Sequence, residues 1–425
     1  MATAIPRPPA KIRLLGFINV SDWKLRTKLL IAFIIAAFLP LGSEAYTAIT
    51  ASTRYLLAQG TTNLVSHSTS TSNAIDQYLI SHREDIVSLS LLQSMVAYVT
   101  NPSDAQLKTN ALKELISLSN KKHIESIAIM DSNGVITLSS SDADINTNVQ
   151  FRPYFLEAMK GNAGYISDPS VSVVTGQPAI FFSAPILDSG GNIKGAIRSR
   201  LSLYGIWDLV EADKDSAGPG TFGILLDENG IRIASSQSSG NREQIVSTVL
   251  YAAVVSVPAD VEKTIVSEKR FGNATASSVR VLPLPEVASA LSTPGVTTFE
   301  TTADNSTARH YAAITTLSIK PWHYVLMTPL SVFTGASDEL SRNFMIQALV
   351  IAAILIIAVL IIARSITQPI IELTKVADRI SLGELDAKID INRKDEIGEL
   401  AESVSRMQAS LQAAIERLRA RRTNQ

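Results

Sequence analysis

The sequence predicts an α+β protein that crosses a membrane twice. Two long apolar segments lie far apart, at residues 29–49 and 344–363, and the polar region between them mixes helical and strand-like patterns. The second segment, FMIQALVIAAILIIAVLIIA, carries no charged residue. At about 1.5 Å rise per residue it is long enough for a hydrocarbon core of about 30 Å. We therefore expect two transmembrane helices with a folded region between them.

The first apolar segment is less uniform, because it contains Pro40 and Glu44. Basic residues flank both segments on one side, namely Lys11, Arg13, Lys24, Arg26 and Lys28 before the first and Arg364 after the second. This bias places residues 1–28 and the C-terminal region in the cytoplasm, with the intervening residues outside. Ser43-Glu44-Ala45 also resembles a signal-peptide cleavage site. The charged region before it is long for a signal peptide, which favours an uncleaved anchor.

Composition argues against several kinds of site. The 38 basic and 39 acidic residues nearly cancel, so there is no overall basic signal for nucleic acid. Cysteine is absent, which excludes disulfides, thiolate metal sites and thiol nucleophiles. No GxxxxGK[ST], Gly-x-Ser-x-Gly or His-Glu-x-x-His motif occurs. We therefore expect no catalytic residue, no metal and no cofactor, and a chain that is not an enzyme.

The region between the apolar segments changes from a helical to a strand-like pattern. Apolar residues recur at helical spacing between Thr47 and Thr100, which predicts one long helix with Gly60 as a candidate break point. Two similar segments follow, IAIMDSNGVITLSS from Ile127 and GILLDENGIRIASS from Gly223. In each, Asn-Gly joins two β-prone runs, which is typical of a hairpin. The matched ends favour a duplicated module over two unrelated hairpins.

Four short motifs in this region carry a family resemblance. They are RPYF at 152–155, YISDP at 165–169, TGQP at 175–178 and SAPI at 183–186. In order and spacing they resemble the double Cache family of extracytoplasmic sensors, over residues 50–341. The resemblance implies a long helix followed by two tandem PAS-like antiparallel-sheet modules. We call these the distal module, at about residues 105–210, and the proximal module, at about 220–330. Ligands of the family typically bind the distal module.

The Cache resemblance also implies ligand-binding residues. Cache domains that bind amino acids hold the carboxylate with an arginine and an aromatic residue, and the amine with a tyrosine and an aspartate. Arg152 matches the arginine, and Tyr154 and Phe155 occupy the two aromatic positions, although their identities are not the commonest there. Tyr165 and Asp168 follow in the adjoining loop and are further candidate ligand-binding residues. The chain departs from the family at the later aspartate, where Arg200 stands.

Strand alternation places Arg198 and Arg200 on one face of the strand at residues 195–203, opposite an apolar face expected to pack on the long helix. Two arginines directed at the site would suit a ligand with two anionic ends, because guanidinium groups pair bidentately with carboxylates. The predicted ligand is a small anion, such as a di- or monocarboxylate. In the alternative, both arginines are solvated or paired with Asp168 or Glu157. Asp168 could also cap a turn.

Residues 364–418 carry a separate coiled-coil pattern. Apolar residues alternate spacings of three and four from Ile366 to Ile380 and from Ile397 to Leu418, which specifies a coiled-coil seam. The segment resembles a HAMP linker, and the resemblance implies a parallel four-helix coiled coil in a homodimer. The alternative is a coiled coil without a signalling role. The signalling residues implied are Pro369, Gly383, Leu385, Ile389, Asp395, Glu396 and Gly398. We interpret the basic tail, residues 419–425, as a solvated helix end.

These features predict a receptor of the bacterial inner membrane that senses a small extracytoplasmic carboxylate. It would signal through HAMP to a separate kinase, cyclase or chemotaxis component, in a chemotaxis or two-component system. All five histidines precede the second apolar segment, and the tail is too short for a catalytic domain. One alternative is the sensor half of a histidine kinase, cyclase or chemoreceptor whose output domain is truncated or split off. Another is an ectodomain scaffold without signalling.

Overall fold

The computed structural model describes residues 23, 25–237, 250–272, 279–303 and 308–423. The chain divides into two compact units. One comprises residues 53–335, and the other comprises the residues before and after that range. Each unit is described by itself below.

Helix α1, Leu25–Ser90, is continuous and contains Pro40. Gly60 lies inside this helix, so the break considered there does not occur. A Cβ atom at Gly60 would collide with the ring of Phe333. The glycine therefore allows a close approach of Phe333 and does not interrupt the helix, which is a packing requirement that no local pattern reveals.

The distal module contains a six-stranded antiparallel sheet with the order β2-β1-β6-β5-β3, and β4 also pairs with β5. Its strands are β1 Ile124–Asp131, β2 Ile136–Ser139, β3 Tyr165–Ile166, β4 Ser170–Val171, β5 Pro178–Leu187 and β6 Ile193–Ser202. Its helices are α2 Gln93–Thr100, α3 Ala105–Ser119, the 3₁₀ turn η2 Asp142–Asp144 and α4 Pro153–Met159.

The proximal module contains a five-stranded antiparallel sheet with the order β8-β7-β11-β10-β9. Its strands are β7 Phe222–Leu226, β8 Arg232–Ser235, β9 Thr298–Thr302, β10 Arg309–Thr316 and β11 His323–Pro329. Its helices are α5 Tyr204–Glu211, α7 Ala259–Ser267 and α8 Pro285–Ser292. In both modules the first hairpin lies at one edge and its first strand pairs with the last strand of the sheet. This common order is what a duplicated module should show.

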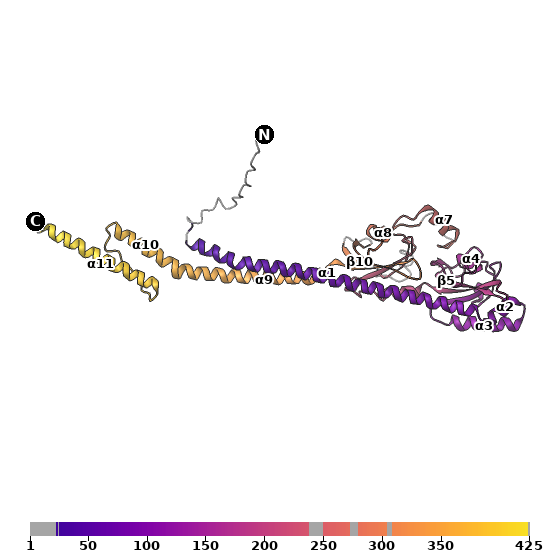
Figure 1. The fold of residues 1–425 in the computed structure, drawn as a ribbon. Helices are drawn as coiled ribbons and strands as arrows, with labels where there is room; N and C mark the ends of the chain where they lie inside the picture. The colour runs from indigo at the N-terminus through magenta and orange to yellow at the C-terminus, as the bar shows by residue number, and fades with distance from the viewer. Residues whose placement is uncertain (1–22, 24, 238–249, 273–278, 304–307, 424–425) are drawn as a thin grey trace, which may run out of the picture. The chain divides into compact units, whose positions relative to one another are not determined.

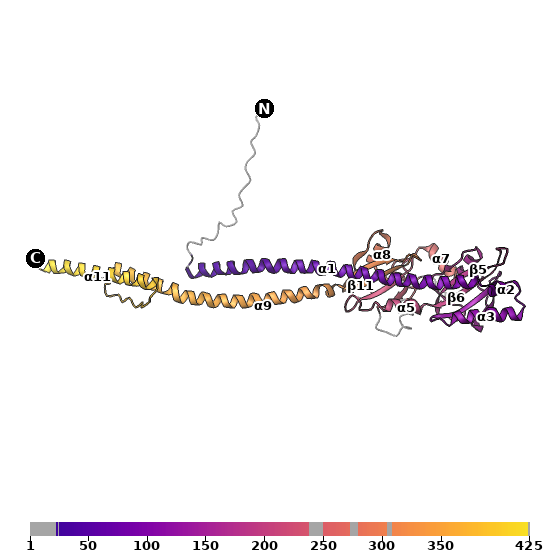
Figure 2. The same ribbon diagram turned by 60° about the horizontal axis from the view of Figure 1, so that its bottom comes forward.

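Both sheets pack one face against α1 (Figures 1 and 2). Ile75 and Leu79 of α1 share a buried core with Ile197 of the distal sheet and Leu326 of the proximal sheet. Ile197 belongs to the face of β6 that the sequence predicts to contact the long helix. Ala196, on the other face of β6, belongs to a separate core around α4. Each fully buried Leu or Ile side chain stabilises this packing by about 1.5 to 3 kcal/mol.

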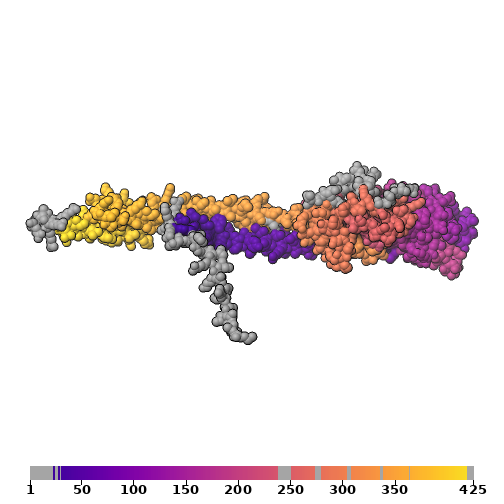
Figure 3. Space-filling model, turned by 90° about the horizontal axis from the view of Figure 1, so that it is seen from above, coloured from indigo at the N-terminus to yellow at the C-terminus, as the bar shows by residue number. Residues whose placement is uncertain are grey.

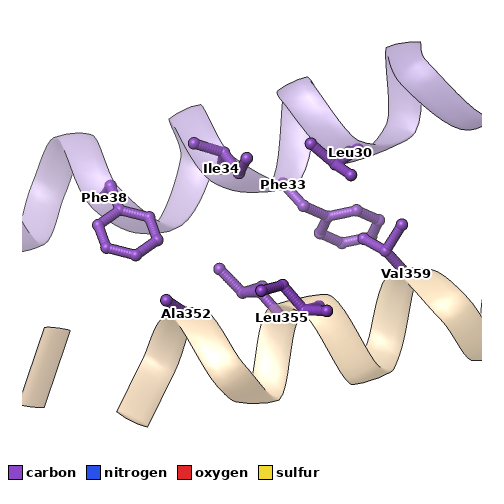
Figure 4. Close-up of a pocket in the computed structure, with 8 residues that line it drawn as sticks. Leu30, Phe33, Ile34, Phe38, Ala352, Leu355 and Val359 are labelled. Atoms are coloured by element: carbon purple, nitrogen blue, oxygen red, sulfur yellow. The ribbon is translucent and has the colours of Figure 1, made fainter. Parts of the chain in front are cut away.

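The second unit contains helices that are apolar or amphipathic. They are α9 Leu330–Ile362, which begins in the first unit, the π-helical turn Ala363–Thr367, α10 Gln368–Ser381 and α11 Glu396–Thr423. In the part of the chain that the structure describes, two helices are long and apolar enough to cross a membrane, within Leu30–Ser90 and Leu330–Ser381. The N-terminal part of α1 and the C-terminal part of α9 line an apolar cavity of about 320 Å³, with Phe33 and Phe38 facing Leu355 across it (Figure 4).

Candidate functional site

Arg198 and Arg200 of β6 converge on the carboxylate of Asp144, which ends the turn η2. Arg198 Nη2 lies 2.9 Å from Asp144 Oδ2, and Arg200 Nη1 lies 2.6 Å from Asp144 Oδ1. Arg200 Nε also donates to Glu125 Oε2 at 2.9 Å. The exposed fractions of Arg198, Arg200 and Asp144 are 1%, 2% and 0%. Both arginines are therefore buried and paired, and their partners are neither Asp168 nor Glu157, the candidates named from the sequence.

Asp144 is held ionised by these neighbours. Burial alone would raise the pKa of Asp144, but the charges of Arg198 and Arg200, with a hydrogen bond from Ser126, hold that pKa below its usual value. Its Oδ2 also accepts from the hydroxyl of Ser139 at 3.0 Å. Asp144 and Glu125 together balance the charges of the two arginines. This side of the site therefore presents little unpaired positive charge.

The lowered pKa of Asp144 predicts a pH dependence of stability. A carboxylate with a lowered folded-state pKa stabilises the fold fully above its unfolded pKa, about 3.9, and loses that contribution as the pH falls towards the folded value. The difference in unfolding free energy between the wild type and Asp144→Asn should be constant from pH 7 to pH 5 and shrink below about pH 4. Urea titrations of both proteins at each pH measure this difference in unfolding free energy. A difference that grows in acid would contradict an ionised Asp144.

Arg152 lies at the start of α4 and is 1% exposed. Its Nη1 donates to the backbone oxygen of Glu268 at 2.9 Å and more weakly to that of Lys269 at 3.5 Å, and its Nη2 donates to the oxygen of Val171 at 3.0 Å. Its Nε is buried without a hydrogen-bond partner. Burial lowers the pKa of Arg152, although Tyr154 and Glu268 act in the opposite direction.

Tyr154 and Phe155 lie in the core beside these arginines, and each is 3% exposed. The ring of Tyr154 stacks on Phe181 with centroids 4.6 Å apart, and the guanidinium of Arg198 lies 5.7 Å from the centroid of that same Phe181 ring. Burial raises the pKa of Tyr154, while the nearby charges of Arg198 and Arg152 lower it. Tyr154 is thus close to both Arg152 and Arg198.

Tyr165 and Asp168 lie towards the proximal module. Asp168 Oδ1 accepts from Trp322 Nε1 at 3.2 Å and lies 3.0 Å from Lys320 Nζ, and its Oδ2 is 3.9 Å from Arg270 Nη1. All three partners belong to the proximal module. Burial raises the pKa of Asp168, but Arg270 and Lys320 outweigh burial and lower it. Burial, with a smaller effect of Asp168, raises the pKa of Tyr165.

Sequence reasoning missed three of the residues that set this geometry, namely Asp144, Glu268 and Arg270. Asp144 stands in a loop, and nothing in its spacing relates it to β6. The pairing of β1 with β6 and of β1 with β2 brings η2 to the arginines. Asp144 could have been identified from the sequence only by predicting that sheet register.

The HAMP-like residues form a second candidate site. Pro369 lies in the first turn of α10 and Glu396 begins α11. In the connector between these helices, Gly383 has φ of +99°, a value that favours glycine. Asp395 Oδ1 accepts from the amide of Gly398 at 3.1 Å. A Cβ atom at Gly398 would collide with the backbone oxygen of Arg393, so this position requires glycine.

The connector packs against both helices of this segment. Leu385 and Ile389 contact a core made by Ile380, Ala387 and Val404. Four large apolar heptad residues of α11 are exposed on a single chain, namely Leu400, Met407, Leu411 and Leu418, at 47%, 56%, 42% and 64%.

Residues 49–337 match the Cache domain family, and residues 361–413 match the HAMP domain family. The chain belongs to the Cache domain family. The combination of the two domains makes this Cache protein a signal-transduction sensor, with the sensor domain of a membrane receptor. Both matched domains are signalling modules rather than catalytic ones.

Two curated relatives of this Cache protein come from Bacillus subtilis (strain 168). The methyl-accepting chemotaxis protein McpA is 48% identical over 52 residues, which is 12% of this chain and 8% of the relative. The methyl-accepting chemotaxis protein TlpB is 31% identical over 103 residues, which is 24% of this chain and 16% of the relative. The alignments thus span a small part of either relative.

Solved sensor domains are also similar to this Cache protein. One is the sensor domain of the V. cholerae histidine kinase DctB, with a TM-score of 0.48 and 13% identity, covering 63% of this chain and 98% of the other. Another is the ligand-binding domain of the Campylobacter jejuni chemoreceptor Tlp3 in complex with 4-methylisoleucine. Its TM-score is 0.47 and its identity 13%, covering 65% of this chain and 94% of the other.

Proposed function

We propose that this protein is a transmembrane receptor that binds a small organic carboxylate in its distal module and signals through HAMP. The site would comprise the residues that the sequence singles out, Arg152, Tyr154, Phe155, Tyr165, Asp168, Arg198 and Arg200. The partner would be a separate cytoplasmic protein. The two curated relatives are chemotaxis proteins, which favours a chemotaxis component over a kinase or a cyclase.

One observation carries the carboxylate proposal. Among the described residues, the buried guanidinium of Arg152 hydrogen bonds only to neutral backbone oxygens. A buried charge without a hydrogen-bonded counter-ion is unfavourable, and burial lowers the pKa of Arg152. An anion at Arg152 would supply the missing charge and form a salt bridge in which donor and acceptor are both ionised.

The paired arginines narrow the ligand class. Because Asp144 and Glu125 already neutralise Arg198 and Arg200, these two residues offer little to a second carboxylate. We therefore favour a ligand with one carboxylate over a dicarboxylate. In this arrangement Arg152 holds the anionic end, and the aromatic residues beside it contact the rest of the ligand.

The test is a binding screen on the full chain in nanodiscs. Acetate, propionate and succinate are compared with chloride at equal ionic strength, and a ligand selective for the folded state raises the melting temperature. We expect a monocarboxylate to stabilise the chain more than succinate does. Putrescine, which is a cation, serves as the control of opposite charge. Stabilisation by putrescine alone would contradict the proposal.

Arg152→Gln should weaken carboxylate binding by roughly thirty-fold or more. Breaking one side of a buried charge-assisted pair costs about 2 to 5 kcal/mol, and about 1.4 kcal/mol corresponds to tenfold in Kd. Isothermal titration calorimetry measures the dissociation constant of the carboxylate. Arg309→Gln is the matched control, because Arg309 is exposed and paired with Glu300 in the proximal module. Unchanged affinity in Arg152→Gln would remove Arg152 from the site.

We further propose that α1 and α9 span the membrane and that the chain is a homodimer with both termini in the cytoplasm. The flanking basic residues support this orientation. The exposed heptad residues of α11 support the dimer, because an apolar seam open to water in one chain is covered in a parallel four-helix coiled coil. In such a dimer, movement of α9 would reach the HAMP helices directly.

A further inference from the structure

A short segment of the proximal module lies against the distal module. This junction segment, residues 268–272, follows α7 and contacts residues 168–171 of the distal module. The amide of Val171 donates to the oxygen of Arg270 at 2.8 Å, and Arg270 Nε donates to the oxygen of Pro169 at 3.1 Å. Figure 3 shows the distal module, in magenta, in contact with the proximal module, in orange.

The backbone of the junction segment is turned sharply, which directs its carbonyl groups at Arg152. Lys269 has φ of +50° and Gly272 has φ of +82°. The oxygens of Glu268 and Lys269 both accept from Arg152 Nη1. The guanidinium that the proposed function assigns to a ligand carboxylate is thus already bonded to the other module.

Arg270 holds the junction segment in place by charge. Its Nη2 lies 2.8 Å from Asp227 Oδ2 of the proximal module, and its Nη1 lies 3.9 Å from Asp168 Oδ2 of the distal module. Asp227 and Asp168 together outweigh the effect of burial and raise the pKa of Arg270. The distal module therefore contacts the segment through the charge of Asp168, the backbone of Pro169 and Val171, and the guanidinium of Arg152. A ligand at Arg152 would compete only for the guanidinium.

We propose that the junction segment is a latch between the modules, which a carboxylate releases by displacing the oxygens of Glu268 and Lys269 from Arg152. This inference rests on the proposed function, because it takes Arg152 as the ligand anchor. A carboxylate is the stronger acceptor for a guanidinium, so the exchange of partners is favourable. Coupling is reciprocal, so holding the latch closed must weaken ligand binding by the factor with which the ligand opens it.

A disulfide across the junction tests the latch. An added Cβ atom at Gly272 would lie 3.4 Å from the Cβ of Val171, close to the separation of about 3.5 to 4.5 Å found in disulfides. The chain has no cysteine of its own, so Val171→Cys with Gly272→Cys introduces a single possible bridge. We expect the oxidised chain to bind acetate or propionate roughly 5- to 150-fold more weakly than the same chain after reduction.

The single variants Val171→Cys and Gly272→Cys, treated with the same oxidant, are the controls and should bind as their reduced forms do. If the oxidised double variant binds as well as its reduced form while the wild type also binds, the latch is wrong and the proposed function stands. If no carboxylate binds the wild type, the proposed function fails and the latch with it.

Hydrogen exchange gives a measurement that needs no ligand. In Arg152→Gln the junction segment loses its contact with Arg152, so the amide of Val171, which donates to Arg270, should exchange faster than in the wild type. Arg309→Gln should leave that exchange rate unchanged. Equal rates in all three proteins would show that Arg152 does not hold the junction segment, and would overturn the latch.

Discussion

Replacing Asp144 with alanine is expected to lower the free energy of unfolding by about 3 to 5 kcal/mol. The change removes a carboxylate that contacts two guanidinium groups and leaves Arg198 and Arg200 buried, with Arg200 still paired with Glu125. Removing one member of a buried ion pair costs more than the pair contributes, because the remaining charge is desolvated without compensation. Urea titration followed by tryptophan fluorescence measures the effect, since Trp207 is 1% exposed in the folded chain.

Asp142→Ala is the matched control for this prediction. Asp142 belongs to the same turn η2 but is exposed, so its loss should change the unfolding free energy by less than about 0.5 kcal/mol. If Asp144→Ala and Asp142→Ala were equally stable, the buried pairing of Asp144 with the arginines would be refuted.

Leu400→Lys is expected to abolish most of the dimerisation of the cytoplasmic helices. At the proposed seam each chain would bury one lysine beside the lysine of its partner, and a buried unpaired charge costs several kcal/mol per ion. Leu411→Cys provides the measurement, because two cysteines at a seam position form an interchain crosslink in an otherwise cysteine-free chain. We expect efficient crosslinking in Leu411→Cys alone and little when Leu400→Lys is added.

Ser405→Lys is the control for the lysine, because Ser405 is exposed and lies outside the heptad positions. It should leave the crosslink at position 411 intact. Glu402→Cys is the control for the cysteine and should crosslink poorly. Efficient crosslinking at position 402 with none at position 411 would show that the helices pack through another face.

Local patterns were sufficient for much of the fold. The Asn-Gly hairpins, the face of β6 that contacts α1, and the apolar residues of α10 and α11 all follow from spacing along the chain, because each depends on residues a few positions apart. The motifs around Arg152 and the HAMP connector likewise identified the Cache and HAMP regions. The sequence by itself thus determined the class of protein and the elements on which the candidate site residues stand.

The partners of those residues were decided only by the tertiary structure. Arg198 and Arg200 meet Asp144 because strand register brings β6 beside β1 and η2, an arrangement that spacing along the chain does not encode. Arg152 contacts Glu268, 116 residues further along, because the two modules pack against each other. Gly60 is required within α1 because the ring of Phe333 fills the space beside it. In each case the deciding contact joins residues that are distant in sequence. Such a contact stabilises the fold only after both segments have been brought together.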